Sequence, residues 1–377
     1  MKIFFTWHAA VETEYRKLFQ ELRRLNIELL VLIPNEWTEG GRLQRYTQKH
    51  SDDYQALVLS VIFRDKIKRF FYPNLKALVR EFRQFRPDIV HIFEEPYSIA
   101  CAQLVGLTRT FCPEAKIVVQ SFENLLPSHP LPFSVIERFV LQRAHALVIV
   151  PHEGEALWRA RGFKGPIYQV PVGLDETFFK KADAFLTGMF PKRSSLRFAY
   201  IGRLVQEKGV SLLLQAFHSL VKEEMNVELL IVGNGSERNA LELQVNQLGI
   251  GGRVFFFDAF QSHILPLLYS NIDILVLPSL TTSNWKEQFG RVLVEAMACE
   301  TAVVGSSSGE IPYIVGDAGI VFLEGNISSL SRVLKDLVID HDLRKKLGQA
   351  GRGRVLQNFT WKSVAKRLCG IYTEIKN

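Results

Sequence analysis

Short apolar runs alternate with amphipathic segments along the chain, and this alternation restricts the fold more than any other feature of the sequence. A strand buried on both faces of a parallel sheet reads as a continuous apolar run, whereas a covering helix shows apolar residues every three or four positions. Between Lys181 and Ser195, the pairs Thr187-Gly188 and Phe190-Pro191 interrupt the pattern. The sequence therefore predicts an α/β protein with two doubly wound, Rossmann-like units.

Each half of the chain has its own set of expected elements. The strands expected in the first half cover residues 2–6, 28–33, 89–92, 116–120, 146–150 and 167–170. Those expected in the second half cover residues 197–201, 227–232, 254–257, 274–277, 302–305 and 320–322. Helical periodicity marks residues 14–25, 74–85, 133–143, 210–222, 237–248, 264–269 and 291–298, with a last helix near 361–375.

These elements predict a first domain over residues 1–180, a linker over 181–195 and a second domain over 196–358. With 377 residues, the chain is long enough for two domains of ordinary size. Ligands of doubly wound sheets bind beyond the carboxyl ends of the strands. We therefore expect the two domains to face each other across a cleft that holds the site.

Composition and charge exclude several classes of function. The formal net charge is +7, but no polybasic tail or arginine-rich tract is present, so the chain is not expected to bind nucleic acid. The four cysteines are scattered without metal-ligand or disulfide spacing, which indicates a reducing compartment. No stretch reaches the roughly 18 apolar residues of a membrane span, and the first residues resemble a buried strand rather than a signal peptide. We expect a cytoplasmic protein that is at most bound to a membrane surface.

The run from Lys286 to Ala298 carries the chemistry. It contains two carboxylates, Glu287 and Glu295, separated by seven residues. An eight-residue step is a little over two helical turns, so both acids could lie along one face of a helix that begins near Phe289-Gly290. Unpaired N–H groups at a helix start suit an anionic ligand, and carboxylates accept hydrogen bonds from hydroxyls. A nucleotide-sugar has both kinds of group; the alternative is an ordinary surface helix with two solvated glutamates.

The same run resembles the Glu-x7-Glu element of the retaining glycosyltransferases with the GT-B fold, the group 1 branch that includes bacterial glycan-assembly enzymes. The resemblance extends over roughly residues 198–322 and is carried by several motifs in the family's order. They are Tyr200-Ile201-Gly202-Arg203-Leu204, Glu207-Lys208-Gly209, Ile231-Val232-Gly233-Asn234-Gly235, Asp273 to Ser279, and Gly309-Glu310-Ile311-Pro312. The resemblance implies two Rossmann-like domains and a C-terminal helix, residues 359–377, that crosses back to the first domain.

Two cations follow the first strand of the second domain. Arg203 and Lys208 at the carboxyl end of a strand could neutralise a diphosphate and stabilise it as a leaving group. The alternative is a pair of solvated surface charges, and the surrounding motif favours phosphate binding. The resemblance further implies that Glu287 holds the donor sugar and Glu295 the ribose.

The remaining donor contacts are also implied by the resemblance. Gly202 and Gly233 would lie at the nucleotide, and the backbone amides of Phe289 and Gly290 would meet the sugar or the phosphates. No Asp-x-Asp motif stands near these elements, so we predict no metal ion and no cofactor other than the donor substrate.

Three positions depart from the family pattern. His8 stands where many relatives have a glycine pair, and it could contact the acceptor or a phosphate, although a lone loop histidine is more often structural. Glu123 stands where relatives commonly have a histidine; it could orient a hydroxyl, accept a proton or stabilise oxocarbenium-like charge, or simply be a capping or surface acid. Tyr313 replaces an acid that follows the Gly-Glu-Ile-Pro motif.

Residues 60–86 combine eight basic side chains with interleaved aliphatic and aromatic ones. A basic amphipathic segment of this kind can lie in a bilayer interface. The alternative is a helix that packs its aromatics on the sheet and leaves its cations in water. This segment is the expected site of any peripheral membrane contact.

Together, these features predict a retaining, metal-independent glycosyltransferase. It would move a hexose from a UDP- or GDP-linked sugar to a sugar hydroxyl of a glycan or lipid-linked acceptor, in polysaccharide biosynthesis. Two alternatives remain open: a nucleotide-sugar epimerase of the same two-domain plan, and a non-catalytic GT-B partner subunit.

Overall fold

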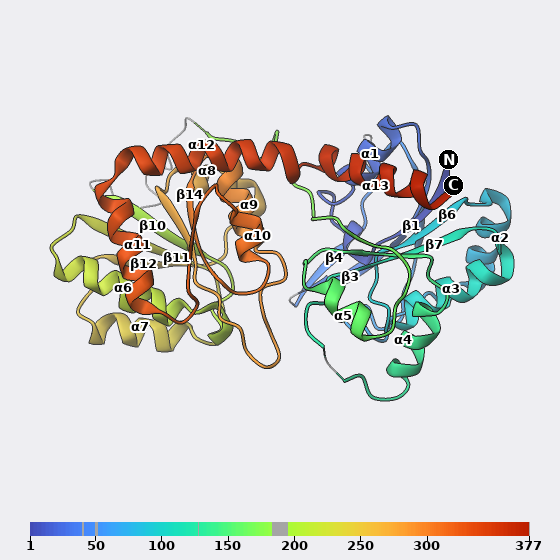
Figure 1. Cartoon of the computed structure of the whole chain (residues 1–377), viewed down its shortest axis with the longest axis horizontal. Coiled ribbons are helices and arrows are strands. Elements are labelled where there is room, and N and C mark those ends of the chain that lie inside the picture. The colour runs from blue at the N-terminus through green and yellow to red at the C-terminus, as the bar shows by residue number, and fades with distance from the viewer. Residues whose placement is uncertain (40, 50–51, 127, 183–194, 377) are drawn as a thin grey trace. The chain divides into compact units, whose positions relative to one another are not determined.

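A computed structural model describes residues 1–39, 41–49, 52–126, 128–182 and 195–376. The chain divides into two compact units (Figure 1). The first comprises Met1–Gly173 together with Trp361–Asn377, and the second comprises Leu174–Thr360. Most of the linker expected at 181–195 lies outside the described residues.

The first unit is built on a seven-stranded parallel sheet. Its strands run in the order β5 (Gln55–Leu59), β2 (Glu28–Pro34), β1 (Lys2–Thr6), β6 (Ile89–Ile92), β7 (Lys116–Ser121), β8 (Ala146–Ile149) and β9 (Ile167–Gln169). The helices of this unit are α1 (Lys17–Arg24), α2 (Leu75–Phe85), α3 (Ile99–Phe111), α4 (Phe133–Leu141), α5 (Gly154–Ala160) and α13 (Trp361–Lys376). A short 3-10 helix, η1 (His8–Val11), follows β1, and an antiparallel hairpin joins β3 (Glu36–Glu39) to β4 (Arg42–Arg45).

The second unit has a six-stranded parallel sheet. Its strands run in the order β12 (Val254–Phe257), β11 (Val227–Val232), β10 (Leu196–Ile201), β13 (Ile274–Leu277), β14 (Ala302–Ser306) and β15 (Ile320–Phe322). Its helices are α6 (Val210–Lys222), α7 (Arg238–Gln247), α8 (Leu265–Ser270), α9 (Arg291–Ala298), α10 (Ile311–Val315), α11 (Ile327–Ile339) and α12 (His341–Asn358). Two 3-10 helices, η2 (Gln206–Lys208) and η3 (Ser262–Ile264), complete it.

The central strands form because their apolar runs are buried on both faces. Every residue of β11 and of β13 is buried, as their Val, Ile and Leu residues predict, and the one charged residue of β11, Glu228, pairs with Arg197. Several helices begin at a side chain that accepts a backbone N–H, such as Asn74 before α2 and Ser98 before α3. The prediction of an α/β protein with two doubly wound units is confirmed.

The strand order gives each sheet one topological switch point. In the first unit β1 lies between β2 and β6, and the chain adds β2 on one side of it and β6 on the other. In the second unit β10 lies between β11 and β13 in the same way. Loops that leave the carboxyl ends of these strand pairs diverge to opposite faces of the sheet, and the space between them is where such folds bind ligands.

The last helix, α13, belongs to the first unit, where it packs against α1. Its Tyr372 hydroxyl lies 2.5 Å from Nδ1 of His91 on β6, and Nε2 of the same ring lies 3.0 Å from Oε1 of Gln120. Burial lowers the pKa of His91 to about 3, so the ring is neutral: Nε2–H donates to Gln120 while Nδ1 accepts from Tyr372. This buried chain of hydrogen bonds fixes the C-terminal helix on the sheet.

Replacing Tyr372→Phe leaves Nδ1 of His91 buried without a partner. We expect the free energy of unfolding, measured by urea denaturation, to fall by about 1–3 kcal/mol. The control is Tyr168→Phe. The hydroxyl of Tyr168 also donates to a residue of α13, Glu374, over 2.6 Å, but this contact lies at the protein surface. The control should change stability by less than about 0.5 kcal/mol. Equal effects of the two substitutions would contradict this role for the buried hydroxyl.

Candidate active site

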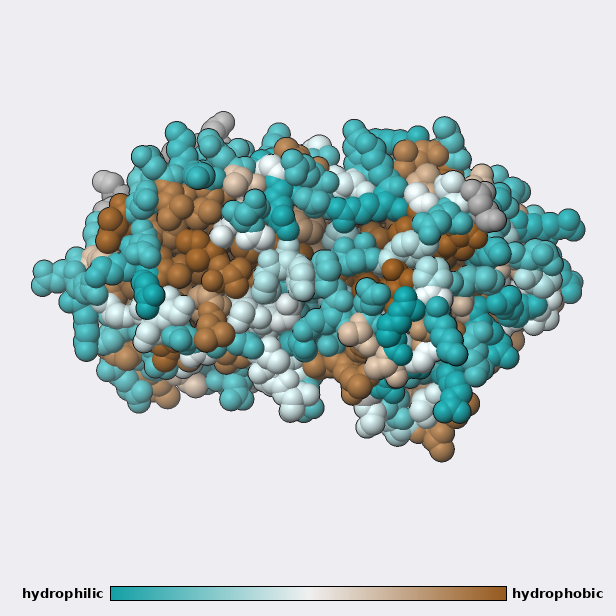
Figure 2. Space-filling model, viewed as in Figure 1, coloured by the Kyte–Doolittle hydropathy of each residue, from teal (hydrophilic) through white to brown (hydrophobic). Residues whose placement is uncertain are grey.

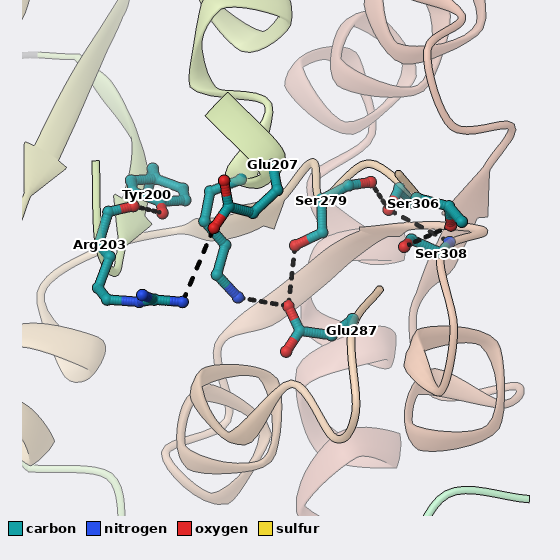
Figure 3. A network of polar contacts seen from close by, with 9 residues as sticks. Tyr200, Arg203, Glu207, Ser279, Glu287, Ser306 and Ser308 are labelled. Carbon is teal, nitrogen blue, oxygen red and sulfur yellow. Dashed lines mark hydrogen bonds and ion pairs between the residues drawn. The ribbon is translucent and has the colours of Figure 1, made fainter. Parts of the chain in front are cut away.

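In the second unit, an ion pair connects the loops that follow β10 and β13, the two strands at the switch point (Figure 3). Nζ of Lys208, at the end of η2, lies 2.6 Å from Oε2 of Glu287. Oγ of Ser279, just after β13, donates to the same carboxylate oxygen over 2.9 Å. The ammonium also lies 4.5 Å above the ring of Trp285. The structure thus brings together two of the charged residues that the sequence singled out.

Glu287 does not lie on a helix, which corrects the expectation that both glutamates share one helix face. Helix α9 begins at Arg291, after Gly290, whose φ of +75° places it in the left-handed region. Glycine adopts this conformation without strain, and the helix therefore cannot extend back beyond Gly290 toward Glu287. Glu287 instead lies in the preceding loop, where its carbonyl oxygen accepts the N–H of Glu310 over 3.0 Å.

Glu295 lies on α9 and is buried. Its Oε1 accepts from Nε of Arg291 over 2.8 Å, and its Oε2 accepts from the Tyr269 hydroxyl over 2.7 Å. Burial raises the pKa of Tyr269 well above its usual value, and the neighbouring carboxylate raises it further, so the phenol stays a donor. A carboxylate offers about four acceptor positions, and two donors therefore leave capacity for ligand hydroxyls.

Arg203 extends into solvent at the same edge of the sheet, with a side chain that is 65% exposed. Its guanidinium lies 3.9 Å from Glu207, and its carbonyl oxygen accepts the Tyr200 hydroxyl (Figure 3). The backbone of Arg203 is therefore fixed, while its charged end is weakly held and accessible to an anion.

Three of the remaining predicted donor residues, Gly202, Gly233 and Phe289, leave only their backbone for a donor contact. A Cβ on Gly233 would lie 1.9 Å from the carbonyl oxygen of Gly202, so the turns after β11 and β10 meet at a distance that only glycine allows. The Phe289 side chain is buried, with its ring centroid 6.1 Å from that of Phe359. Its ring belongs to the core, so the predicted donor contact at Phe289 would involve only the main chain.

The switch point of the first unit carries a histidine held by a glutamate. His8, in η1 after β1, places Nδ1 at 2.6 Å from Oε2 of Glu94, and its backbone N–H donates to the other oxygen over 2.7 Å. Burial acts to lower the pKa of His8, but Glu94, with smaller contributions from Glu39 and Glu95, raises the pKa above its usual value. The side chain of Glu94 is fully buried, and its contact with Nδ1 fixes the orientation of the His8 imidazole.

Next to this pair, the loops after β6 and β7 share a carboxylate network. Glu95 accepts from the Ser121 hydroxyl over 2.6 Å and from the Phe122 N–H over 2.8 Å. Glu123 accepts from the Tyr97 hydroxyl over 3.2 Å and from the Leu125 N–H. Burial, with a smaller contribution from Glu123, raises the pKa of Glu95 to about 8. Glu123 lies in the loop and caps no helix.

Sequence reasoning missed several members of both clusters. Glu94 and Glu95 lie two and three residues beyond the expected strand at 89–92, so a search for polar residues near strand ends would have found them. Arg291 stands four residues before Glu295, a spacing that pairs side chains on a helix. Tyr97 and Tyr269 carried no local signal, because their roles come from contacts with distant segments.

No group of three or more His, Cys, Asp or Glu side chains in the described part of the chain is arranged to hold a metal ion. Metal independence remains a prediction. No described helix is both long enough and apolar enough to cross a membrane.

Residues 191–354 match the family model described as glycosyl transferases group 1. An uncharacterized glycosyltransferase of Methanocaldococcus jannaschii is 31% identical over 175 residues, which cover 46% of this chain and 43% of that protein. A capsular polysaccharide biosynthesis glycosyltransferase, CapM of Staphylococcus aureus, is 29% identical over 176 residues, with coverages of 46% and 44%. The chain spans about half the length of the curated relatives it matches.

Solved structures resemble the chain over nearly its whole length. Anabaena HepE in complex with UDP gives a TM-score of 0.76 at 17% identity and covers 99% of this chain and 100% of that one. The sucrose-phosphate synthase of Thermosynechococcus elongatus gives 0.73 at 18% identity, with coverages of 100% and 99%. At these identities the likeness establishes the fold, which is the GT-B fold expected from the sequence.

The raised pKa of Glu95 predicts a pH-dependent cost to stability. Between about pH 4.5 and about pH 8, the folded protein holds a proton on Glu95 that the unfolded chain has released. Stability contributed by this group therefore falls as pH rises through that window. The free energy of unfolding of the wild type minus that of Glu95→Gln should decrease steadily across it, as measured by urea denaturation. A constant difference would show that the carboxyl is not perturbed.

Proposed function

Residues 191–354 place this chain among the group 1 glycosyltransferases, and from that premise we propose that it is a retaining, metal-independent hexosyltransferase. A hexose would move from a UDP- or GDP-linked donor to a sugar hydroxyl of a glycan or lipid-linked acceptor, in polysaccharide biosynthesis. The observation that carries this proposal is the largely buried Lys208–Glu287 pair, joined by Ser279 at the switch point of the second unit.

In the proposed reaction, the bond between the anomeric carbon and the diphosphate breaks, and the acceptor oxygen bonds to that carbon on the same face. The proton of the acceptor hydroxyl passes to the leaving diphosphate. Lys208 and the exposed guanidinium of Arg203 stabilise the negative charge that develops there. Helix α9 would add the partial positive charge of its N-terminus beside Gly290.

Glu287 would accept a hydrogen bond from a donor-sugar hydroxyl, and Glu295 from the ribose. The Lys208–Glu287 pair supports this division because it holds one cation and one acceptor in contact before any ligand arrives. A donor would then enter between them, with phosphate oxygens on the ammonium and a hydroxyl on the carboxylate. Gly202 and Gly233 would allow the nucleotide to approach the main chain.

The acceptor would bind the polar edge of the first unit. His8 and Glu123 offer acceptor atoms for sugar hydroxyls, and both are oriented by neighbours, Glu94 and Tyr97 respectively. The carboxylates of Glu94 and Glu123 make this edge unfavourable for a phosphate. We therefore assign His8 to the acceptor rather than to the donor diphosphate. The protein would act in the cytoplasm, with peripheral membrane contact through residues 60–86.

The donor is identified by a thermal-shift screen against UDP- and GDP-hexoses, since a ligand of the native state raises its melting temperature. Transfer is then followed as nucleoside diphosphate release across an acceptor panel, and the anomeric configuration of the product is determined by proton NMR. Retention is expected. Epimerised donor in the absence of acceptor would indicate the epimerase, and binding without turnover the non-catalytic partner; either result would overturn the proposal.

Removing either member of the ion pair should abolish most transfer, but it also leaves a buried charge unpaired, which costs about 3–5 kcal/mol of stability. The double variant Lys208→Met with Glu287→Gln removes both charges. We expect it to recover the stability lost by Lys208→Met alone, while its transfer rate remains at least about a hundred-fold below that of the wild type. Lys335→Ala, at an exposed pair with Glu223, is the control and should transfer normally. Recovery of transfer together with stability would limit the pair to a structural role.

Glu123→Gln tests the acceptor half. The amide oxygen can still accept from Tyr97, so folding is preserved, but the negative charge is lost. We expect transfer to fall about a hundred-fold while the donor-induced thermal shift stays unchanged. Glu114→Gln, at an exposed position before β7, is the matched control. Unchanged transfer by Glu123→Gln would remove this residue from the mechanism.

A further inference from the structure

Eight consecutive residues, Ile62 to Arg69, are exposed in the loop that follows β5. Three of them are large and apolar: Ile62 is 42% exposed, Phe63 53% and Ile67 39%. Isolated exposed apolar residues are ordinary on a protein surface, but three within six positions of one loop are not.

This loop is held in shape by its own backbone. An antiparallel bridge pairs Ile62 with Phe71, whose carbonyl oxygen accepts the Ile62 N–H over 3.1 Å. The Lys66 N–H donates to the carbonyl oxygen of Phe63, and Phe70 N–H donates to that of Lys66. Phe70 itself is fully buried and anchors the base. The apolar side chains are therefore exposed on a fixed protrusion.

Phe63 adopts a conformation that neither packing nor backbone preference explains. Its φ of +58° lies in the left-handed region, which bulky residues avoid. Such strain persists where the surrounding structure imposes it, and it clusters at functional sites. Here it exposes an aromatic ring to solvent.

Cations surround these apolar groups. The loop carries Arg64, Lys66, Lys68 and Arg69, against Asp65 within it and Glu36 of β3 beside it. The balance is two positive charges in excess. An apolar tip surrounded by cations complements an anionic bilayer surface. The cations can contact the outer phosphates, and the apolar side chains can enter the hydrocarbon beneath them.

A second loop extends the same surface. Leu126 and Leu131, in the loop after β7, and Val135, in the first turn of α4, are 60%, 76% and 59% exposed. Hydrophobic atoms at the lower tip of the first unit, below α4, are visible in Figure 2. Tyr97 contacts both loops. Nζ of Lys68 lies 5.2 Å from the centroid of the Tyr97 ring, and the centroids of the Tyr97 and His129 rings lie 4.1 Å apart.

We propose that these two loops and the first turn of α4 form a docking edge, residues 62–69 together with Leu126, Leu131 and Val135, that binds the surface of an anionic phospholipid bilayer. Apolar side chains from both loops enter the interface, and the loop cations contact lipid phosphates. Because both loops follow the carboxyl ends of parallel strands, they lie at the edge that carries His8 and Glu123. The ring of Phe70 lies 5.9 Å from that of His8, so a docked bilayer would lie beside the acceptor residues.

The basic residues of helix α2 are not part of this edge, although they belong to the segment 60–86. Leu78, Phe82 and Phe85 turn into the core, so these apolar residues of the helix are not available to a membrane. Arg80 pairs with Glu81, and Arg83 lies 5.0 Å from the centroid of the Phe111 ring. The expected single amphipathic segment is in fact a loop followed by a core-packed helix.

Co-sedimentation of the full chain with vesicles tests the docking edge without any glycosyl transfer. The probes are vesicles of phosphatidylcholine alone and of phosphatidylcholine with phosphatidylglycerol. We expect binding to the anionic vesicles only, weakening as salt is added. Lys66→Glu with Arg69→Glu should reduce it at least about ten-fold, since each cation near such a surface contributes about five-fold.

Phe63→Asn with Ile67→Ser removes the apolar tip, and asparagine tolerates the left-handed conformation, so folding is preserved. We expect about ten-fold weaker binding with an unchanged melting temperature. Lys76→Glu with Arg83→Glu on α2 changes the net charge as much as the loop variant and should bind nearly as wild type. Equal loss by the α2 variant, equal binding to neutral vesicles, or no sedimentation at low salt would each overturn the proposal. A failure to transfer sugar would leave it standing.

Discussion

The position of every candidate residue depends on one constraint, which is where parallel strands end. In each unit the chain adds strands first on one side of a strand and then on its other side, and the connecting helices therefore lie on opposite faces of the sheet. The loops after β1 and β6 diverge for this reason, and so do those after β10 and β13. Polar groups in these loops need not be covered by a helix. Lys208 and Glu287 occupy one such position, and His8 and Glu94 occupy the other. Two sheets of similar topology therefore present two polar edges with different chemistry.

The two edges differ in charge. The second unit presents Arg203 and Lys208, which suit a diphosphate, and it balances Lys208 with Glu287 while no ligand is bound. The first unit presents carboxylates, with one of them protonated near neutral pH because burial raises the pKa of Glu95 to about 8. A partly buried charge without a partner is costly. The ion pair and the histidine–glutamate contact are thus what allows charged groups to remain at these edges before a substrate arrives.

Strongly periodic segments were predictable because their local pattern and their tertiary environment agree. Strands β11, β12 and β13 and helices α6 and α9 begin and end where the sequence predicted. The hairpin of β3 and β4 was missed because it is built from charged residues: Glu36 faces Arg45 across the strands, and only Trp37 is buried. Edge strand β5 was missed although residues 56–59 form an apolar run, because so short a run does not by itself distinguish a strand from a helix. In the hairpin, pairing with a neighbour rather than hydrophobic pattern makes the strand.

The sequence by itself determined the fold class, the family resemblance and the residues most suited to a diphosphate and a sugar, because short-range periodicity and ordered motifs are properties of the local chain. Only the tertiary structure decided which of these residues meet. Glu287 lies outside the expected helix because Gly290 takes a left-handed conformation. In the loop it contacts Lys208, which is 79 positions away in the sequence. Glu94 contacts His8, 86 positions away in the sequence, because β1 pairs with β6. The basic segment divided into an exposed loop and a buried helix face because burial is set by the sheet against which a segment packs, and composition does not encode that choice.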